Sequence, residues 1–584
     1  MDKIIVKNLV NKSNEIRNFL IKTVSKTGGH LGANLGTVEF VVAAHAIFKL
    51  KNLKDIMIFD TGHQGYVHKI LTGRKKNFSN LNKFRGMSRF LTPQESKFDI
   101  IEASHAGTAL SIANGISETN YLKKKKQEIL VVMGDGALNE GMNFEALNHL
   151  KDCKGKIIII FNDNNYFIDK SVGSIKYMSE NFITKKTFKN FFSSLGLDYL
   201  LVRDGHDINL LLNQFKKAKQ NKNHTVVHIK TTKGKGLEIA KKHKYKLHFS
   251  EALNIKTGKT IFKPSVKNNF NFTTAKFIEA LMKKDKRIIL VTPATPYTNF
   301  LQEISDKYKD RIIDVGMAEQ HAVGFSIGLS MRGYKPICFF QSTFMQRAFD
   351  QFLHDVGYMK SNVLFISARS GLSGLDSPTH HGIYDLSYLQ AIPNLDIIYP
   401  ACMNTVKTEV LGYLQKKTGP KLLLMPYYEI PNFLKKYKFI KKEGYYWIKN
   451  FSNKRNKKKI TIFCLINTLD ICLVVSRELL KKNINVKLVC IEKIKKINKN
   501  LIINNSKNSL MSCTVEENNL INGLGYNITN IFNENNLKMY NLKIGFNDCY
   551  VESGKREDIL DNSNLNPKKI LIKIKEKINV LSKK

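Results

Sequence analysis

The sequence predicts an α/β protein with three doubly wound domains built on mainly parallel sheets. Three observations predict this fold class. Short apolar runs alternate with helical patterns, and the alternation restarts twice after long polar passages. The chain has 584 residues, which is too long for one hydrophobic core. Regular alternation of strands and helices is typical of parallel sheets that are covered by helices on both faces.

The first block of alternation predicts a domain over residues 1–262. Three Val/Ile-rich runs have the length and boundaries of buried strands. They are residues 129–133, 156–161 and 224–230. A helical pattern at 143–151 separates the first two. The passage 241–271 is polar, rich in lysine and without clear periodicity, so we interpret it as a linker.

The second and third blocks predict domains over residues 270–436 and 456–584. The second block begins with a helical pattern at 273–283. Its predicted strands are residues 287–291, 335–340 and 363–368. A second polar passage, 437–459, is followed by the third block, whose predicted strands are residues 460–465 and 486–490. Strand–helix alternation in each block indicates parallel sheets.

The composition limits the classes of partner. The chain carries 93 Lys and Arg against 49 Asp and Glu, a formal net charge of +44. A strongly basic balance of this kind is typical of proteins that bind nucleic acid. The basic residues are, however, spread along the chain among Asn and Ile, and no nucleic-acid-binding motif accompanies them. We therefore interpret the charge as compositional and expect no nucleic-acid partner.

Cysteine usage and hydropathy indicate a cytoplasmic protein. The 8 cysteines are scattered and form no CxxC pair, which argues against a zinc site or a disulfide framework and favours a reducing compartment. No apolar stretch is long enough to cross a bilayer, so we expect no membrane partner. The first twenty residues lack the apolar run of a signal peptide.

Polar residues after two of the predicted strands indicate a metal and diphosphate site. Gly134, Asp135 and Gly136 follow the strand 129–133, and Asn164 follows the next strand. Ligands of doubly wound sheets bind at the carboxyl ends of the strands, and Mg²⁺ prefers hard oxygen ligands. Asp135, Asn164 and the carbonyl of Tyr166 are therefore the predicted metal ligands, and the glycines allow a diphosphate to approach the backbone closely.

Seven segments, in the same order along the chain, resemble the 1-deoxy-D-xylulose-5-phosphate synthase family of transketolase-like, thiamine-diphosphate-dependent enzymes. They are residues 28–39, 62–74, 134–149, 314–323, 342–351, 378–388 and 514–525. The separation of the Gly-Asp-Gly string from Asn164 matches the signature of thiamine-diphosphate enzymes. The resemblance implies a transketolase-like fold and thiamine diphosphate with Mg²⁺ as cofactors.

The resemblance also implies roles for individual residues. Glu319 matches the glutamate that hydrogen-bonds the aminopyrimidine, and Phe344 matches the ring that stacks on it. His30, His63 and His380 match histidines suited to proton transfer near the reacting atoms. The other implied cofactor contacts are His63, Ser104, His105, Gly134, Asp135, Gly136, Ala137, Asn164 and Lys242. The implied substrate contacts are Arg369, Asp376, His380 and His248, with Arg369 binding the acceptor's phosphate.

The sequence departs from the family at the predicted acceptor site. Gln341 replaces the family's tyrosine, and Leu424 and Tyr427 stand in a stretch where the family has two arginines. Ala106 and Gly107 replace two serines. The changes at Gln341, Leu424 and Tyr427 imply that the acceptor pocket has been rebuilt, that phosphate binding is weak, or that the acceptor differs.

The activity implied by the resemblance is condensation of pyruvate with D-glyceraldehyde 3-phosphate, giving 1-deoxy-D-xylulose 5-phosphate and CO₂. The product is a precursor of isoprenoids, thiamine and pyridoxal in the family's pathway. Two alternatives stay open: a transketolase acting on sugar phosphates, and a catalytically impaired member with an altered acceptor. The resemblance implies a homodimer.

Overall fold

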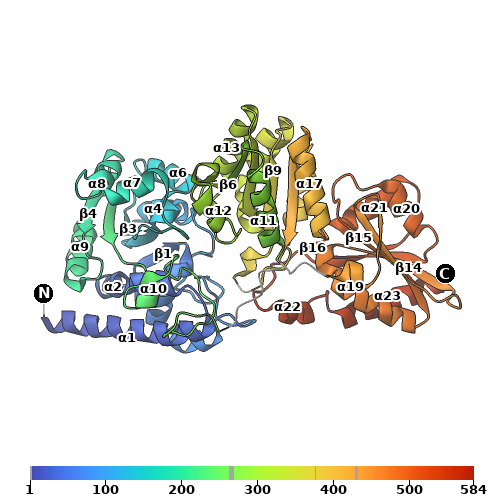
Figure 1. Cartoon of the computed structure of the whole chain (residues 1–584). Coiled ribbons are helices and arrows are strands. Elements are labelled where there is room, and N and C mark those ends of the chain that lie inside the picture. Colours follow the sequence, from blue (N-terminus) through green and yellow to red (C-terminus); the bar gives the residue numbers. More distant parts are fainter. Residues whose placement is uncertain (1–2, 262–268, 375, 428–431, 584) are drawn as a thin grey trace. The chain divides into compact units, whose positions relative to one another are not determined.

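The computed structural model describes residues 3–261, 269–374, 376–427 and 432–583. The chain forms two compact units (Figure 1). Unit 1 comprises residues 1–264 with 315–318, and unit 2 comprises residues 265–314 with 319–584. No helix in the described part of the chain has the length and apolar character needed to cross a membrane.

Unit 1 contains one parallel sheet with strand order β1-β2-β3-β5-β4. Its strands are β1 (Ile56–Asp60), β2 (Ile129–Gly134), β3 (Ile157–Asp163), β4 (Asp198–Val202) and β5 (Thr225–Lys230). Its helices are α1 (Lys3–Thr27), α2 (Leu31–Ile47), α3 (Tyr66–Lys69), α4 (Ala109–Leu122), α5 (Asp135–Leu138), α6 (Gly141–His149), α7 (Gly173–Glu180), α8 (Thr187–Ser194), α9 (Ile208–Gln220) and α10 (Glu238–Lys242). The three strands predicted for this block are confirmed, and β1 and β4 are additions.

Both faces of this sheet are buried, as the apolar runs predict. Successive residues of a strand point to opposite faces, and they enter two different cores. Leu130 and Val132 pack with residues of α1, α2 and α9, whereas Val131 and Met133 pack with residues of α4, α6 and α8. Helices on both faces make this a doubly wound sheet.

The interpretation of residues 241–271 as a linker is wrong for its first part. Leu247 and Leu253 are buried in the core of unit 1. Ser250 and Gly29 exchange two backbone hydrogen bonds, of 2.8 and 2.9 Å. This passage therefore packs against the start of the first histidine segment, while residues 262–268 lie outside the described residues.

Unit 2 contains two sheets, the first of which is wholly parallel with order β10-β11-β9-β8-β6-β7. Its strands are β6 (Ile288–Thr292), β7 (Ile312–Asp314), β8 (Lys335–Gln341), β9 (Leu364–Ser370), β10 (Asp396–Ile398) and β11 (Lys421–Pro426). The helices around it are α11 (Phe270–Met282), α12 (Gln302–Lys307), α13 (Glu319–Met331), α14 (Ser342–Met345), α15 (Phe349–Gln351), α16 (Asp385–Leu389), α17 (Met403–Gln415) and α18 (Phe433–Lys436).

The second sheet of unit 2 has order β12-β13-β15-β14-β16-β17. Its strands are β12 (Ile440–Lys442), β13 (Tyr446–Phe451), β14 (Lys458–Cys464), β15 (Ile484–Ile491), β16 (Met511–Asn519) and β17 (Asn541–Phe546). Its helices are α19 (Leu469–Lys481), α20 (Lys499–Ser506), α21 (Leu524–Glu534), α22 (Arg556–Asn562) and α23 (Pro567–Ser582). β12 is an edge strand that pairs antiparallel with β13, and β13 pairs antiparallel with β15, so the polar passage 437–459 contributes two strands to this sheet.

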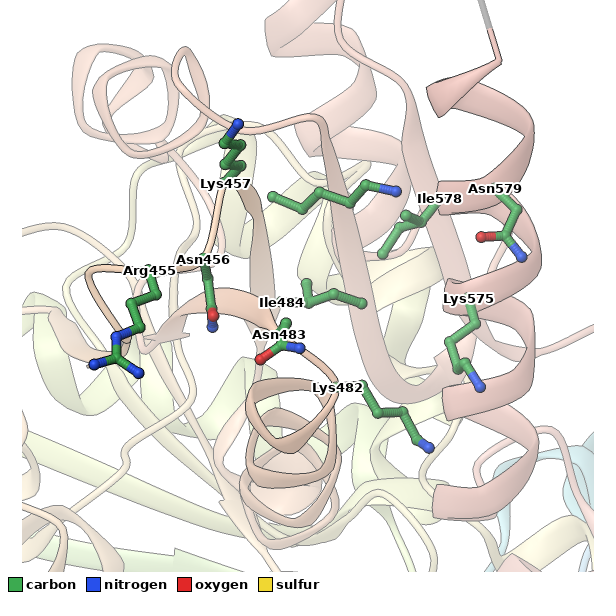
Figure 2. A pocket seen from close by; sticks show the side chains of 10 residues that line it. Arg455, Asn456, Lys457, Lys482, Asn483, Ile484, Lys575, Ile578 and Asn579 are labelled. Atoms are coloured by element: carbon green, nitrogen blue, oxygen red, sulfur yellow. The ribbon is translucent and has the colours of Figure 1, made fainter.

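The observed sheets confirm the predicted fold class, mainly parallel α/β. The division into domains 1–262, 270–436 and 456–584 stays a prediction. Figure 2 shows a pocket of about 590 Å³ beside the last sheet. Five basic side chains contribute to its lining: Arg455, Lys457, Lys458, Lys482 and Lys575. No residue of its lining is a predicted site residue.

Candidate active site

The predicted site residues fall in both units, and in unit 1 they gather at the carboxyl ends of β2, β3 and β5. Asp135 begins α5 directly after β2, and Asn164 follows β3. Asp135 Oδ2 accepts hydrogen bonds from the backbone N–H of Asn164, at 3.3 Å, and of Tyr166, at 3.2 Å. Asn164 Oδ1 accepts from the Tyr166 N–H at 3.1 Å. Adjacent parallel strands therefore bring the three predicted metal ligands together.

The Asp135 carboxyl is buried. Burial raises its pKa, and the nearby Asp163 carboxylate raises it further. Asp163 itself is held ionised by a hydrogen bond with His228 and an ion pair with Lys230 at 3.0 Å, which lower its pKa against the effect of burial. A cation bound at Asp135 would favour its ionised form.

Three predicted histidines lie close together beside this edge. The ring centroids of His63 and His248 are 4.8 Å apart, and His30 lies 5.2 Å from His63 and 5.6 Å from His248. Phe90 and Phe249 also contact the His30 ring. Burial, with the Lys233 charge nearby, lowers the pKa of His63 to about 3, so this imidazole is neutral near pH 7.

Lys233 is a residue that the sequence reasoning missed. Its side chain is buried, and Nζ lies 2.8 Å from the Phe167 carbonyl and 2.9 Å from His248 Nδ1. The signal that could have found it is its place just after β5, at the same edge of the sheet as Asp135. Lys242, the predicted lysine contact, is exposed at the end of α10.

The remaining predicted cofactor contacts of unit 1 lie at the turn from β2 into α5 and in the segment 81–108. A Cβ added to Gly136 would lie 3.2 Å from both Met317 Sδ and Phe167 Cδ1, so this position is tightly enclosed. Gly134 and Ala137 flank the turn from β2 into α5. Ser104 and His105 follow residue 103, whose carbonyl accepts from the Gly62 N–H, next to His63.

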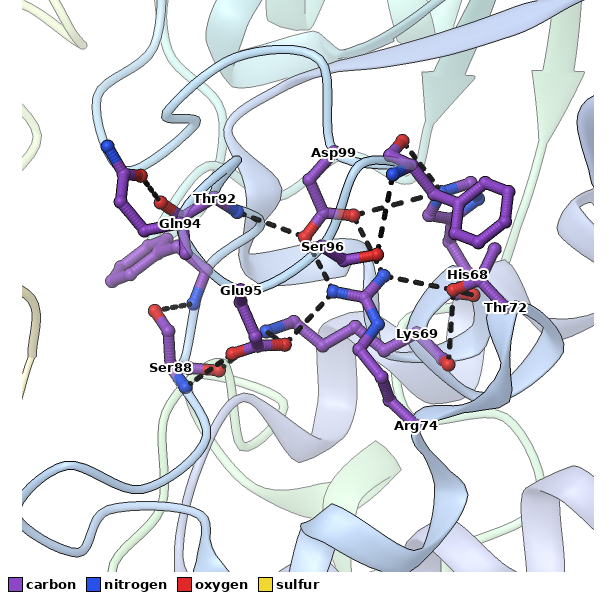
Figure 3. Close-up of polar contacts among 12 residues, drawn as sticks. His68, Lys69, Thr72, Arg74, Ser88, Thr92, Gln94, Glu95, Ser96 and Asp99 are labelled. Carbon is purple, nitrogen blue, oxygen red and sulfur yellow. Dashed lines mark hydrogen bonds and ion pairs between the residues drawn. The ribbon is translucent and has the colours of Figure 1, made fainter. Parts of the chain in front are cut away.

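A buried ion network holds the long segment that carries several of these residues (Figure 3). Residues 81–108 contain no helix or strand. Arg74 donates to both oxygens of Asp99, at 2.6 and 2.8 Å, and to Glu95 at 2.9 Å. Lys69 donates to Glu95 at 2.7 Å and to the Ser88 carbonyl at 2.9 Å. The network thereby ties residues 69–74 to the segment that includes Phe90 and Ser104.

Removal of Arg74 is expected to destabilise this segment strongly. Arg74→Ala leaves the fully buried Asp99 carboxylate without its cation, and breaking a buried ion pair costs about 3–5 kcal/mol. Native-state hydrogen exchange over residues 86–99 measures the loss. Lys75→Ala is the matched control, because the exposed Lys75–Glu15 pair contributes at most about 1 kcal/mol. Equal protection in both variants would contradict the expected role of the network.

In unit 2, Glu319 begins α13 and is buried. Burial raises its pKa to about 7, against the opposing effect of the Arg347 charge. Its Oε2 atom is buried and has no hydrogen-bond partner among the described residues. A protein rarely leaves such an oxygen unpaired, so the position suits a ligand that donates a hydrogen bond.

The other predicted residues of unit 2 surround the ends of β8 and β9. Phe344, in α14, packs edge-on against His380 with ring centroids 5.7 Å apart. The His380 Nδ1 atom lies 3.1 Å from Ser377 Oγ. Arg369 donates from Nη1 to Asp376 Oδ2 at 2.8 Å. Phe344, His380, Arg369 and Asp376 therefore come from one group of loops.

The chain is similar to known proteins over most of its length. Family models match residues 1–191 and 178–231 (1-deoxy-D-xylulose-5-phosphate synthase), 270–431 (transketolase, pyrimidine binding domain) and 451–570 (transketolase, C-terminal domain). A 1-deoxy-D-xylulose-5-phosphate synthase of Clostridium acetobutylicum is 35% identical, covering 93% of this chain and 93% of the relative. That of Clostridium beijerinckii is 35% identical, covering 96% of each. The chain belongs to the 1-deoxy-D-xylulose-5-phosphate synthase family.

The structure also places the three positions that the resemblance predicts to differ from the family's pattern at the acceptor site: Gln341, Leu424 and Tyr427. Leu424 is fully buried in β11, so an arginine there would place a charge in the core. Tyr427, by contrast, is partly exposed and lies under Arg369, whose guanidinium is 5.2 Å from the ring centroid. Gln341 is buried and donates to Thr298 Oγ1 at 2.7 Å. Of Leu424 and Tyr427, it is therefore Tyr427 that adjoins the predicted acceptor residues.

Proposed function

We propose that this chain condenses pyruvate with D-glyceraldehyde 3-phosphate to 1-deoxy-D-xylulose 5-phosphate and CO₂, using thiamine diphosphate and Mg²⁺. Membership of the family over nearly the whole chain supports the reaction. The observation that carries the proposal is the buried Glu319 carboxyl with one unpaired oxygen. Such a carboxyl can share a proton with N1′ of an aminopyrimidine, donating a hydrogen bond when it is protonated and accepting one when it is ionised.

The donor set in unit 1 fits a cation that is shared with a diphosphate. Among the described residues, no group of three His, Cys, Asp or Glu side chains could hold a metal ion. Asp135, Asn164 and the Tyr166 carbonyl supply three oxygens, and Mg²⁺ commonly completes its octahedron with phosphate oxygens and water. The enclosed Gly136 backbone leaves room for a diphosphate where a side chain would not fit. Burial lowers the pKa of Lys233, at the same edge, to about 7, and a bound diphosphate would favour its charged form.

When bound, thiamine diphosphate supplies the carbon nucleophile that adds to the keto group of pyruvate and carries the two-carbon unit to the aldehyde. The protein's part is to bind, orient and move protons. Glu319 would hold a proton at N1′ of the pyrimidine, and Phe344 would pack on that ring. His63 and His248 are neutral because burial lowers their pKa values, so each imidazole can donate one hydrogen bond and accept another at the substrate oxygens. We assign similar roles to His30 and His380.

The acceptor half of the site depends on Arg369. Its guanidinium pairs with Asp376 and lies over Tyr427, so part of its charge is already balanced. We therefore expect a high KM for D-glyceraldehyde 3-phosphate and weak discrimination against unphosphorylated aldehydes, with an ordinary KM for pyruvate.

Arg369→Ala is expected to raise the KM of the phosphorylated acceptor by about tenfold to a hundredfold, because a charge-assisted hydrogen bond contributes roughly 1.5–3 kcal/mol. The KM of pyruvate should not change. Steady-state kinetics with each substrate varied in turn measures both values. Tyr427→Phe, which keeps the ring under the guanidinium, is the matched control. A low acceptor KM that survives Arg369→Ala would show that another cation binds the phosphate.

The reaction itself is tested by incubating the purified protein with pyruvate, candidate aldehydes, thiamine diphosphate and Mg²⁺, and by identifying the products. CO₂ release with 1-deoxy-D-xylulose 5-phosphate supports the proposal. Ketol transfer between sugar phosphates without CO₂ would indicate a transketolase, and absence of turnover would indicate an impaired member.

We also propose that the protein works as a cytoplasmic homodimer whose product feeds isoprenoid, thiamine and pyridoxal synthesis. The scattered cysteines support the compartment, and the family resemblance supports the dimer. Light scattering at several protein concentrations tests the assembly. We propose neither a nucleic-acid nor a membrane partner.

A further inference from the structure

The end of β9 and the loop between β9 and α16 carry three of the residues assigned to the acceptor step: Arg369, Asp376 and His380. Residue 375 of this loop lies outside the described residues. Its two ends are joined because Gly371 and Gly382 exchange backbone hydrogen bonds of 2.9 and 2.8 Å. We call residues 369–382 the acceptor loop. The contacts that hold the acceptor loop therefore set the positions of these three side chains.

One attachment of the acceptor loop is a glutamate from the other sheet of unit 2. Glu517 lies in β16 and its side chain is fully buried. Its Oε2 atom accepts a hydrogen bond from the Leu372 N–H at 3.1 Å. Gly371 has φ +89°, and a Cβ there would lie 2.8 Å from the same oxygen. The carboxylate thus packs directly against the backbone of the loop.

Arg556, the first residue of α22, holds Glu517 from the opposite side. Its Nε and Nη2 atoms donate to Glu517 Oε1 at 2.9 and 2.6 Å. Nη2 also donates to the Asn467 carbonyl at 2.7 Å, and Nη1 donates to Asp470 at 3.3 Å. The guanidinium is therefore fixed by several acceptors, and it balances a carboxylate that would otherwise be a buried unpaired charge.

A second attachment joins the acceptor loop to the segment just before Arg556. The Ser373 N–H donates to His381 Nδ1 at 3.2 Å, so Nδ1 is the acceptor and the ring proton is on Nε2. Nε2–H in turn donates to the Glu552 carbonyl at 3.2 Å. The Gly554 N–H donates to the Gly374 carbonyl at 3.2 Å. Residues 552–556 and Glu517 thus hold the loop at several points.

We propose that Glu517 is a positioning residue for the acceptor step, acting through the acceptor loop and held in place by Arg556. This inference rests on the proposed function. It gives the second sheet of unit 2, and the segment 514–525 singled out in the sequence, a part in the reaction, because that sheet sets the position of Arg369, Asp376 and His380 without touching substrate.

The test compares Glu517→Gln with Glu516→Gln in the full-length protein. Glutamine can still accept from Leu372 but cannot balance Arg556. We expect the acceptor KM to rise by about tenfold to a hundredfold, with the pyruvate KM and the cofactor affinity unchanged. Arg556→Lys keeps the positive charge but loses the two parallel hydrogen bonds of the guanidinium. The acceptor KM should therefore rise less in Arg556→Lys than in Arg556→Met.

Glu516→Gln is the matched control because Glu516 is the adjacent buried glutamate, and its carboxylate accepts instead from the backbone of Leu524 and Gly525 at 2.7 and 2.8 Å. It should leave the acceptor KM unchanged. Hydrogen exchange over residues 371–384 is a readout independent of turnover. It should quicken in Glu517→Gln and Arg556→Met, and not in Glu516→Gln.

The outcomes separate this inference from the proposed function. A parent protein without product overturns the proposed function, whereas the exchange experiment still reports on the loop. An active parent in which Glu517→Gln behaves like Glu516→Gln overturns the positioning role, as does faster exchange with an unchanged acceptor KM. If Glu517→Gln does not fold, the double variant Glu517→Gln/Arg556→Met replaces it in the comparison. This double variant removes both charges of the buried pair, so neither is left without its partner.

Discussion

Asp135→Ala is expected to abolish Mg²⁺-dependent binding of thiamine diphosphate while leaving the protein folded. Asp135 is the one carboxylate among the three proposed metal ligands, so its removal takes away the charge that favours the cation. Losing the partner of a buried charge costs about 3–5 kcal/mol, which corresponds to roughly a hundredfold to several-thousandfold weaker binding. Calorimetry with the cofactor, in the presence and absence of Mg²⁺, measures this change.

The pKa of Asp135 gives the same prediction a pH dependence. Burial and Asp163 raise this pKa, so the folded apoprotein holds the Asp135 proton more tightly than the unfolded chain does. The metal requires the ionised form, and cofactor affinity should therefore fall as the pH is lowered through the raised pKa. Asp152→Ala, at an exposed position of the same unit, should bind normally. Mg²⁺-dependent binding of thiamine diphosphate that persists in Asp135→Ala would show that Asp135 is not a metal ligand.

The proximity of the proposed metal ligands could be predicted from the sequence because it depends on local rules. Two apolar runs identify neighbouring strands, and polar residues directly after parallel strands meet at one edge of the sheet. These two rules are sufficient to predict that Asp135 and Asn164 lie close together. Glu319, Phe344 and His380 were assigned by resemblance, and composition or spacing alone would not have distinguished them from core residues.

Spacing alone could not show which lysine of this passage is buried. Lys233 and Lys242 both lie in a lysine-rich passage, and which of them is buried depends on how the chain turns between them. Gly234 and Gly236 both have φ +81°, and these turns direct Lys233 inward while α10 leaves Lys242 exposed. That outcome follows from the tertiary structure.

The two polar passages concealed structure for a related reason. Leu247 and Leu253 are isolated apolar residues among lysines, and they are buried only because Ser250 pairs with Gly29, far away in the sequence. All three residues of β12 are exposed at the sheet edge. Edge strands lack the continuous apolar pattern of central strands, so periodicity does not detect them.

Glu319→Gln is expected to slow exchange of the C2 proton of bound thiamine diphosphate by about 10² to 10⁴-fold, the usual contribution of a positioned acid or base. Glutamine keeps the size of the side chain and one acceptor oxygen, but it cannot hold or release a proton at N1′. Cofactor affinity should change little, because the diphosphate and metal contacts belong to other residues. Quenched-flow exchange in deuterated water, followed by NMR, measures the rate.

The same variant has a second signature in the cofactor-free protein, because burial raises the pKa of Glu319 from 4.5 to about 7. The folded protein therefore binds this proton more tightly than the unfolded chain. The stability that it contributes is complete below pH 4.5 and is lost as the pH rises to about 7. Glutamine has no proton to lose, so above this range the variant should be more stable than the parent by on the order of 3 kcal/mol. The exposed Glu303→Gln should show neither effect. Exchange at the parent rate, together with an unchanged pH profile of stability, would mean that Glu319 is not the activating carboxylate.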